Sequence, residues 1–517
     1  DLRWQDRQDT YRASGRVGLR DTSLRFQLHT PGARVERLLQ LAEVSLPLSG
    51  ELRGSVEGAG TVREPVLQGV LQLWDLRTPE VVFQRAGGRF HWQAGVLSVQ
   101  EAELHSAAFD ARLRGAVTAS GDLRLSFSAD AVRLEALRQL QNPILHLQGA
   151  VRVRGEVTGR SYEPVVHAEV TGTRLRVNGE VFDGVEGVVR WASGTLEAAP
   201  LRLRRRLATY VLEGRLQLAD DPVADLALDV RDADLLTLLG VAGVSVDADG
   251  RLSGRLVLSG PLSRPRAELD VQLVAGAFRG YRFSAGTGRV VLEDGRVSLE
   301  DVELVAGRGR LRAEGYVSLR GPSEVEVAGL GLEAAAVSTL ARLRTPLVGT
   351  LDFTLQLSGT LESPTAGLAL EARDVGAAGA QADRLTAQAI YRDGFLELEQ
   401  LLLEEDGQRV RARGRLPLRL RELAADPQGP VDFVASTERA DLGILRLLPF
   451  VESADGPLEA SLRIAGTVTS PQLEGFVRAR GGRVKLVGVN PALEDLQVEV
   501  GFDQAAATLR QLRAGLG

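Results

Sequence analysis

The sequence predicts an all-β fold, mainly antiparallel and with short helices, in which repeats of about 100 residues extend one long curled sheet. Three observations predict this class. Sequence landmarks recur at a spacing close to 100 residues, apolar and polar residues alternate between the landmarks, and turn signals separate the alternating runs. Alternation with a period of two is the pattern of a strand with one apolar and one wet face.

The first landmark is a glycine, four variable residues and a proline, which occurs five times as GTVREP, GRSYEP, GPLSRP, GTLESP and GTVTSP. Successive copies are separated by 99, 101, 99 and 107 residues, and their prolines are Pro65, Pro164, Pro265, Pro364 and Pro471. Proline cannot donate to a sheet ladder, and glycine permits backbone angles that other residues avoid. The motif therefore predicts a hairpin corner that recurs within the chain.

Two further sets of glycines keep the same spacing. Turn-like stretches place a glycine 30 residues after each of the first four prolines, at Gly95, Gly194, Gly295 and Gly394. The third set is spaced by 100, 99, 101 and 99 residues, at Gly15, Gly115, Gly214, Gly315 and Gly414. Asp294-Gly295 between two alternating runs predicts a tight two-residue hairpin. The last turn of this kind reads FDQA and lacks the glycine.

Each repeat is expected to hold about six antiparallel strands and one short helix. The helical stretches read RLEALRQL, DADLLTLLG, GLEAAAVSTLARL and ADLGILRLLPF, with Asp234 and Asp441 suited to N-cap positions. The landmarks divide the chain into a partial repeat at 1–45, four repeats at 46–144, 145–244, 245–345 and 346–450, and a partial repeat at 451–517. We expect one continuous array that belongs to a longer protein, since the chain has no methionine, even at position 1.

Composition argues against several classes of function. The net charge of -6 over 517 residues is nearly balanced, which argues against a nucleic-acid partner. Cysteine is absent, and the five histidines form no metal-spaced cluster, so we expect neither a metal nor another cofactor. No catalytic constellation emerges, and we expect the protein not to be an enzyme. The basic stretch RLRLRRRLATY is interpreted as a wet strand face, with binding to anionic headgroups as the alternative.

The stretch GRLSGRLVLSGPLSRPRAELDVQL, followed by GRVVLEDGRVSLEDVEL and GRLRAEGYVSL, resembles the repeats of the TamB and AsmA-like family. The resemblance rests on strand pattern and repeat texture and covers essentially the whole chain. It implies an elongated curled β-sheet trough, often called a β-taco, with an apolar interior. It also implies a periplasmic body in the cell envelope, held in the inner membrane by an N-terminal anchor that lies outside this chain.

The resemblance further implies a function in outer-membrane biogenesis. Members of the family are associated with phospholipid transport, and with protein assembly and secretion beside a TamA-type barrel in the outer membrane. The first expectation is therefore a conduit that carries phospholipid between inner and outer membranes along an apolar groove. The alternative is a scaffold or chaperone for outer-membrane β-barrel proteins, which would offer its sheet edges to incoming strands.

The residues themselves leave the apolar face open to two interpretations. One amphipathic face must be covered, either by closing into a sandwich core or by an apolar ligand in a trough. Many glycines on the apolar face and an aromatic content of 5% favour the trough. The candidate lining residues, which would contact acyl chains, are Leu256, Leu258, Leu269, Val271, Leu355, Leu357, Leu462 and Ile464.

Overall fold

The computed structural model describes residues 2–6, 9–18, 22–41, 48–61, 63–78, 81–137, 146–241, 247–340, 347–360, 362–377, 380–405, 407–419, 424–443, 451–488, 490–504 and 506–516. It divides into two compact units. The first comprises residues 1–245 and 255–265, and the second comprises residues 246–254 and 266–517. Each unit is described by itself.

The first unit consists of strands with three short helical segments. Its elements are β1 (Leu2–Asp6), β2 (Asp9–Val17), β3 (Ser23–Arg34), α1 (Val35–Leu41), β4 (Ser49–Thr61), β5 (Pro65–Arg77), β6 (Val82–Gln93), β7 (Val96–Ser106), β8 (Asp110–Thr118), β9 (Asp122–Arg133), the 3-10 helix η1 (Leu134–Ala136), β10 (Leu147–Gln148), β11 (Ala150–Arg160), β12 (Glu163–Val177), β13 (Glu180–Ala192), β14 (Thr195–Arg205), β15 (Ala208–Gln217), β16 (Val223–Asp234) and α2 (Leu235–Val241). Strand β17 (Ala248–Pro261) is divided, and its residues from Arg255 onward belong to this unit.

The second unit continues the same construction with one described α-helix. Its elements are β18 (Arg266–Phe278), β19 (Tyr281–Phe283), β20 (Ala285–Glu293), β21 (Arg296–Ala306), β22 (Gly309–Ser318), β23 (Ser323–Glu333), α3 (Ala335–Leu340), β24 (Leu347–Gly359), β25 (Pro364–Ala377), β26 (Ala380–Arg392), β27 (Phe395–Glu405), β28 (Gln408–Arg419), β29 (Ala424–Ala425), β30 (Asp432–Asp441), β31 (Val451–Asp455), β32 (Pro457–Gly466), β33 (Pro471–Leu486), β34 (Leu493–Asp503) and β35 (Ala506–Leu516).

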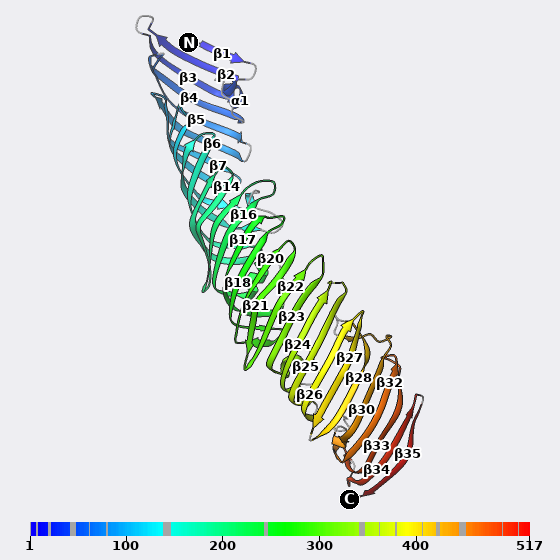
Figure 1. Ribbon diagram of the computed structural model, residues 1–517. Helices are drawn as coiled ribbons and strands as arrows, with labels where there is room; N and C mark the ends of the chain where they lie inside the picture. Colours follow the sequence, from blue (N-terminus) through cyan, green and yellow to red (C-terminus); the bar gives the residue numbers. More distant parts are fainter. Residues whose placement is uncertain are drawn as a thin grey trace. The chain divides into compact units, whose positions relative to one another are not determined.

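Within each unit the strands form an antiparallel meander. In the first unit each long strand from β1 to β16 pairs with the next one along the chain. The same holds from β18 to β35 in the second. Among the described strands no pairing returns to the start of either unit, so each sheet is open (Figure 1). The predicted class, antiparallel β with short helices, is confirmed.

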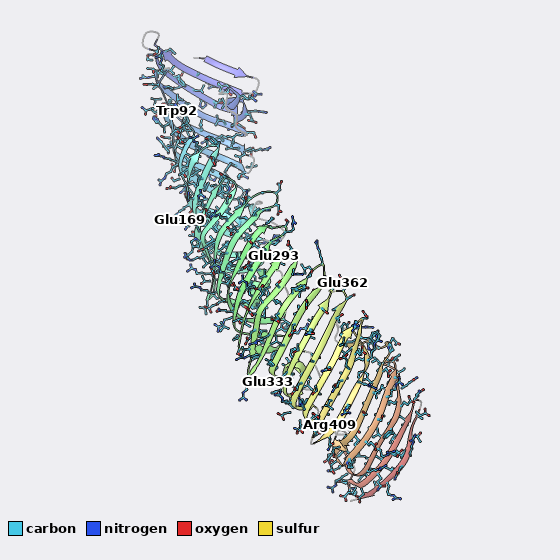
Figure 2. All side chains as sticks on the ribbon, in the orientation of Figure 1. Trp92, Glu169, Glu293, Glu333, Glu362 and Arg409 are labelled. Atoms are coloured by element: carbon cyan, nitrogen blue, oxygen red, sulfur yellow. The ribbon has the colours of Figure 1, made fainter. Side chains whose placement is uncertain are left out.

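Between equivalent landmarks the chain forms an even number of long strands. This even number fixes which edge of the sheet each landmark occupies. From β4 to β9 there are six long strands, and because neighbours run in opposite directions, β11 runs the same way as β4. All glycine–proline corners of a unit therefore lie at one edge, which we call the corner rim. The helices lie at the opposite edge, the helix rim. In Figure 2, Glu362 of a corner and Glu333 beside α3 mark these two edges of the second unit.

The corners have the backbone that the sequence predicted. Gly60, Gly159, Gly359 and Gly466 lie directly opposite the prolines that follow them in the ladder. Their φ values are 101°, 87°, 94° and 96°, in the left-handed region that side chains avoid. A Cβ on Gly60 would lie 2.5 Å from the carbonyl oxygen of Glu64. The motif is therefore a structural device that turns the chain.

The tight turns are also confirmed. Asp294 and Gly295 have φ values of 49° and 73°, and the equivalent pair Ser193 and Gly194 has 48° and 75°. Two successive residues with positive φ make the turn whose twist matches antiparallel strands. At the FDQA turn, Asp503 pairs with Ala506 and Gln504 has φ 41°.

Four of the five glycines in the third set, all except Gly15, lie opposite β-bulges. Val99 pairs with Gly115 and Ala102 with Leu113, so two residues of β7 have no partner of their own in β8. The same irregularity faces Gly214, Gly315 and Gly414. A bulge bends its strand and increases the local twist. These bulges thus recur about every 100 residues and curve the sheet at fixed places.

The helices follow the same spacing. Two of the predicted helical stretches contain α2 and α3, whereas RLEALRQL shows only η1 in its described part. Most of ADLGILRLLPF, residues 444–450, lies outside the described residues. The sequence analysis missed α1, which begins 99 residues before η1. Asp234 caps α2, since its Oδ1 accepts a hydrogen bond from the amide of Leu236 at 3.2 Å.

Removing this cap gives the first testable prediction. Asp234→Ala is expected to lower the free energy of unfolding by about 1 kcal/mol, because the amide loses its acceptor. Urea unfolding followed by circular dichroism measures the change, with Asp220→Ala in an exposed loop as the control. Equal unfolding midpoints for the two variants would show that the cap contributes nothing.

Candidate functional site

Unbroken rows of uncharged residues cross the apolar face of the first unit. Following the ladder pairs from one strand to the next gives a row in which every residue is apolar or glycine. Its members are Leu2, Ala13, Leu28, Val56, Gly69, Phe90, Val99, Gly115, Leu125, Val157, Val166, Trp191, Leu196, Leu216 and Ala224. No carboxylate, guanidinium or amide interrupts this path between β1 and β16.

The second unit contains an equivalent row. It runs from β18 to β35 through residues that pair directly across the ladder. The members are Leu273, Gly286, Leu304, Leu311, Gly329, Phe353, Leu370, Ala387, Leu401, Ala412, Ala435, Leu462, Gly475, Phe502 and Ala507. Register therefore joins the alternating patterns of separate strands into a continuous apolar strip, which alternation in sequence could not establish.

The eight residues proposed from sequence all lie on half-buried positions of strands. Leu462 belongs to the row just described, and Leu355 and Leu357 pair with Leu368 and Ala366 on the neighbouring strand. Ile464 lies between Phe433 and Leu473. In β18, Leu269 pairs with Val290 and Val271 with Gly288. Leu256 and Leu258 belong to the first unit, and the other six residues belong to the second.

The extent of exposed surface shows that the chain is not packed into compact globules. The chain exposes 32055 Å². Two compact globules of half its mass would together expose about 22,000 Å². Among the described side chains that are less than 2% exposed, the largest are Leu442 and Thr237. Few of the described large side chains are therefore fully buried.

The opposite face carries cross-strand ion pairs. Glu197 lies between Arg190 and Arg215 on neighbouring strands, at 3.4 and 4.0 Å. In the basic stretch, Arg204 pairs with Glu186 at 3.7 Å on this face. Arg205 lies on the apolar side of the sheet, in register with Leu203 and Tyr210, and pairs there with Glu180. The Arg204 contact supports the interpretation of the basic stretch as part of a wet strand face, whereas Arg205 departs from it. Figure 2 shows Glu169, another member of the polar face, on the sheet of the first unit.

A carboxylate held by two arginines makes this face sensitive to acid. The guanidiniums of Arg266 and Arg289 lie 2.9 and 2.5 Å from Glu268, and these hydrogen bonds lower the pKa of its carboxyl below the ordinary value. A carboxyl whose pKa is lowered in the folded chain contributes stability above its unfolded pKa. That contribution is lost as the pH falls through the folded pKa.

We therefore expect Glu268→Gln to lower the urea midpoint at pH 7. The difference from the wild type should shrink as the pH falls below the lowered pKa, because Glu268 is then protonated. Glu362→Gln, at an exposed corner, is the matched control. A difference that stays constant from pH 7 down to acid pH would contradict the assignment.

One hollow of the first unit lies on the charged face. Its volume is about 780 Å³, and its walls include Arg112, Arg114, Arg154, Glu156 and Glu169 around Ser126 and Ser128. Charged walls lose hydration when an acyl chain covers them, which is unfavourable. The hollow therefore does not mark the acyl-chain site, and none of the eight proposed lining residues borders it.

Sequence reasoning missed the aromatic residues of the helix rim. Edge-to-face pairs join Phe83 to Phe109 and Phe182 to Tyr210, with ring centroids 6.1 and 5.2 Å apart. A third pair joins Tyr281 to Phe283 in the second unit, at 5.4 Å. Burial raises the pKa of the Tyr210 hydroxyl. The spacing of 99 and 101 residues between Phe83, Phe182 and Phe283 was a visible signal.

Neither a metal-binding cluster nor a membrane-spanning helix is found in the described part of the chain. No group of three histidine, aspartate or glutamate side chains there could hold a metal ion. No described helix is both long and apolar enough to cross a bilayer. No family model matches the sequence, and comparison with curated proteins gives no match either.

Proposed function

We propose that this chain is part of a cell-envelope conduit in which phospholipid acyl chains lie against the apolar face of the sheet. The observation that carries the proposal is the pair of uncharged rows, each crossing its unit from strand to strand without interruption. Apolar contact is non-directional and scales with area, so a lipid gains similar energy at each position along such a row. A ligand can then move along the face without a deep barrier.

The dimensions of the apolar face fit one layer of acyl chains. On β24 the half-buried apolar positions run from Phe353 to Leu357, which is four residue steps or about 14 Å, and Leu351 beyond them is buried. Half of a bilayer's hydrocarbon core is about 15 Å thick. The accessible apolar part of this strand is therefore about as long as an acyl chain of one bilayer leaflet.

The setting of this activity rests on the resemblance to TamB and AsmA-like proteins. On that basis we propose a periplasmic location, an inner-membrane anchor outside this chain, and transport between the inner and outer membranes. A TamA-type barrel is the partner that the resemblance suggests. The structural observations support the lipid-binding face. The support for the cellular setting comes from the resemblance.

Native mass spectrometry tests the proposal directly. The protein is purified gently from a membrane-containing lysate, and its mass is measured before and after lipid extraction. Several phospholipids per chain are the expected result. A bare polypeptide mass, together with failure to take up added phospholipid, would overturn the proposal and favour the scaffold alternative.

A further inference from the structure

The described clusters of buried apolar side chains lie along one of the two rims of each sheet. In the second unit, two clusters of buried side chains lie at the helix rim: Ala306, Leu332, Ala334, Leu351 and Ala372 in one, and Ala440, Leu442, Val451, Ala454, Leu458, Ala479, Val484 and Leu496 in the other. The first unit has a matching cluster of Ala129, Val132, Val151, Leu175 and Val185 beside η1. The apolar face is therefore sealed along this edge.

The helices seal the rim because they lie across the strand ends. α2 follows β16 but contacts β13, and Asn178 Nδ2 donates a hydrogen bond to the carbonyl of Val241 at 2.6 Å. α3 follows β23 but contacts β19, next to Tyr281. Strands are about 4.8 Å apart, so a helix of six or seven residues can span two or three of them. The aromatic pairs fill the space at the same edge.

At the corner rim the described chain provides no such cover. Most of its described turns are short, such as the two-residue turn at Asp294-Gly295 and the four residues between Gly359 and Pro364. The exception is the connection from β28 to β30, in which β29 pairs with β28 and the amide of Val431 donates a hydrogen bond to the carbonyl of Gly466. No described helix lies at this edge in either unit. Leu357 and Ala366, which pair two residues from a corner, are half-buried, whereas Leu351 near α3 is 4% exposed. The apolar face is thus open along this edge.

From this asymmetry we infer a fixed orientation of the bound lipid. Phospholipids cross the corner rim to reach the face, their headgroups stay at that rim in water, and the ends of their acyl chains point toward the helix rim. The inference rests on the proposed function and adds to it the side from which the face is loaded. Headgroups at the helix rim would displace buried apolar side chains, which costs free energy for each side chain exposed.

The absence of cysteine makes the orientation measurable, because each introduced cysteine is the single thiol of the chain. Ala366→Cys places a thiol at the corner rim, and Ala387→Cys places one in the row of Leu370, four residues deeper or about 13 Å. Ala369→Cys, exposed on the opposite face, is the control. All three changes replace alanine, which limits their effect on folding.

Each thiol is labelled with a small fluorophore and mixed with phosphatidylcholine carrying a nitroxide quencher, either on the headgroup or at the end of an acyl chain. We expect the headgroup nitroxide to quench position 366 at least twofold more than position 387, and the chain-end nitroxide to give the reverse order. Position 369 should respond little to either. Equal quenching at 366 and 387, or the opposite order, would overturn the orientation.

The result is separable from the proposed function. If phospholipid copurifies but the quenching order is reversed or flat, lipid binding stands and the orientation fails. If no lipid binds and neither nitroxide quenches position 366 or 387, the proposed function itself fails, and the orientation fails with it.

Discussion

A single carboxylate on the apolar face is expected to remove most of the bound lipid from its neighbourhood. Leu355→Asp places this group between Val327 and Leu368, in contact with the proposed acyl-chain layer. An ionised carboxylate covered by hydrocarbon loses several kcal/mol of hydration. Since 1.4 kcal/mol is a factor of ten in affinity, local occupancy should fall at least about tenfold.

The number of lipids per chain, measured by native mass spectrometry, reports this loss, and far-UV circular dichroism reports the fold. Leu256→Asp makes the same test in the first unit. Gln356→Asp, one residue away on the exposed face, is the matched control and should keep its lipid. If the aspartate variants bind lipid at the native level, the lining assignment is wrong. If they unfold while the control does not, the face is a closed core.

Local signals in the sequence were sufficient for the features that depend on neighbouring residues. The corner at Gly60 and the turn at Gly295 were predicted because each needs a backbone with positive φ, and glycine marks such positions. The cap at Asp234 was predicted for a similar reason. In each case the structural requirement and the residue that meets it lie within five residues of each other.

Features that depend on register were not predictable in this way. The glycine at position 315 was visible as a landmark, but its reason is a bulge on β21, the neighbouring strand. Phe182 packs against Tyr210, 28 residues later, and its strand β13 contacts the helix that follows β16. The uncharged rows likewise arise only when the pairing of every strand is known. Periodicity predicts that each strand has an apolar face, and pairing determines whether the faces join.

The glycine at position 315 is expected to tolerate no side chain. Gly315 has φ 118° and pairs with Leu299 at the edge of the bulge. A Cβ there would lie 2.2 Å from the carbonyl oxygen of Glu324 and 2.9 Å from the Cα of Val325. Both contacts are with backbone, so relief requires the strands to separate. We expect Gly315→Ala to lower the free energy of unfolding by about 3 kcal/mol or more.

Gly367→Ala is the matched control, because it is also a strand glycine of the second unit but has no atom within 4 Å of an added Cβ. Alanine at this open position should leave stability unchanged or raise it by about 0.5 kcal/mol, since it restricts the unfolded chain. Urea unfolding midpoints distinguish the two effects. If Gly315→Ala were as stable as Gly367→Ala, the close approach at the bulge would be wrong. The explanation of the third glycine landmark as a packing requirement would then fail with it, because equivalent carbonyls lie 2.1 Å from an added Cβ at Gly115 and Gly214.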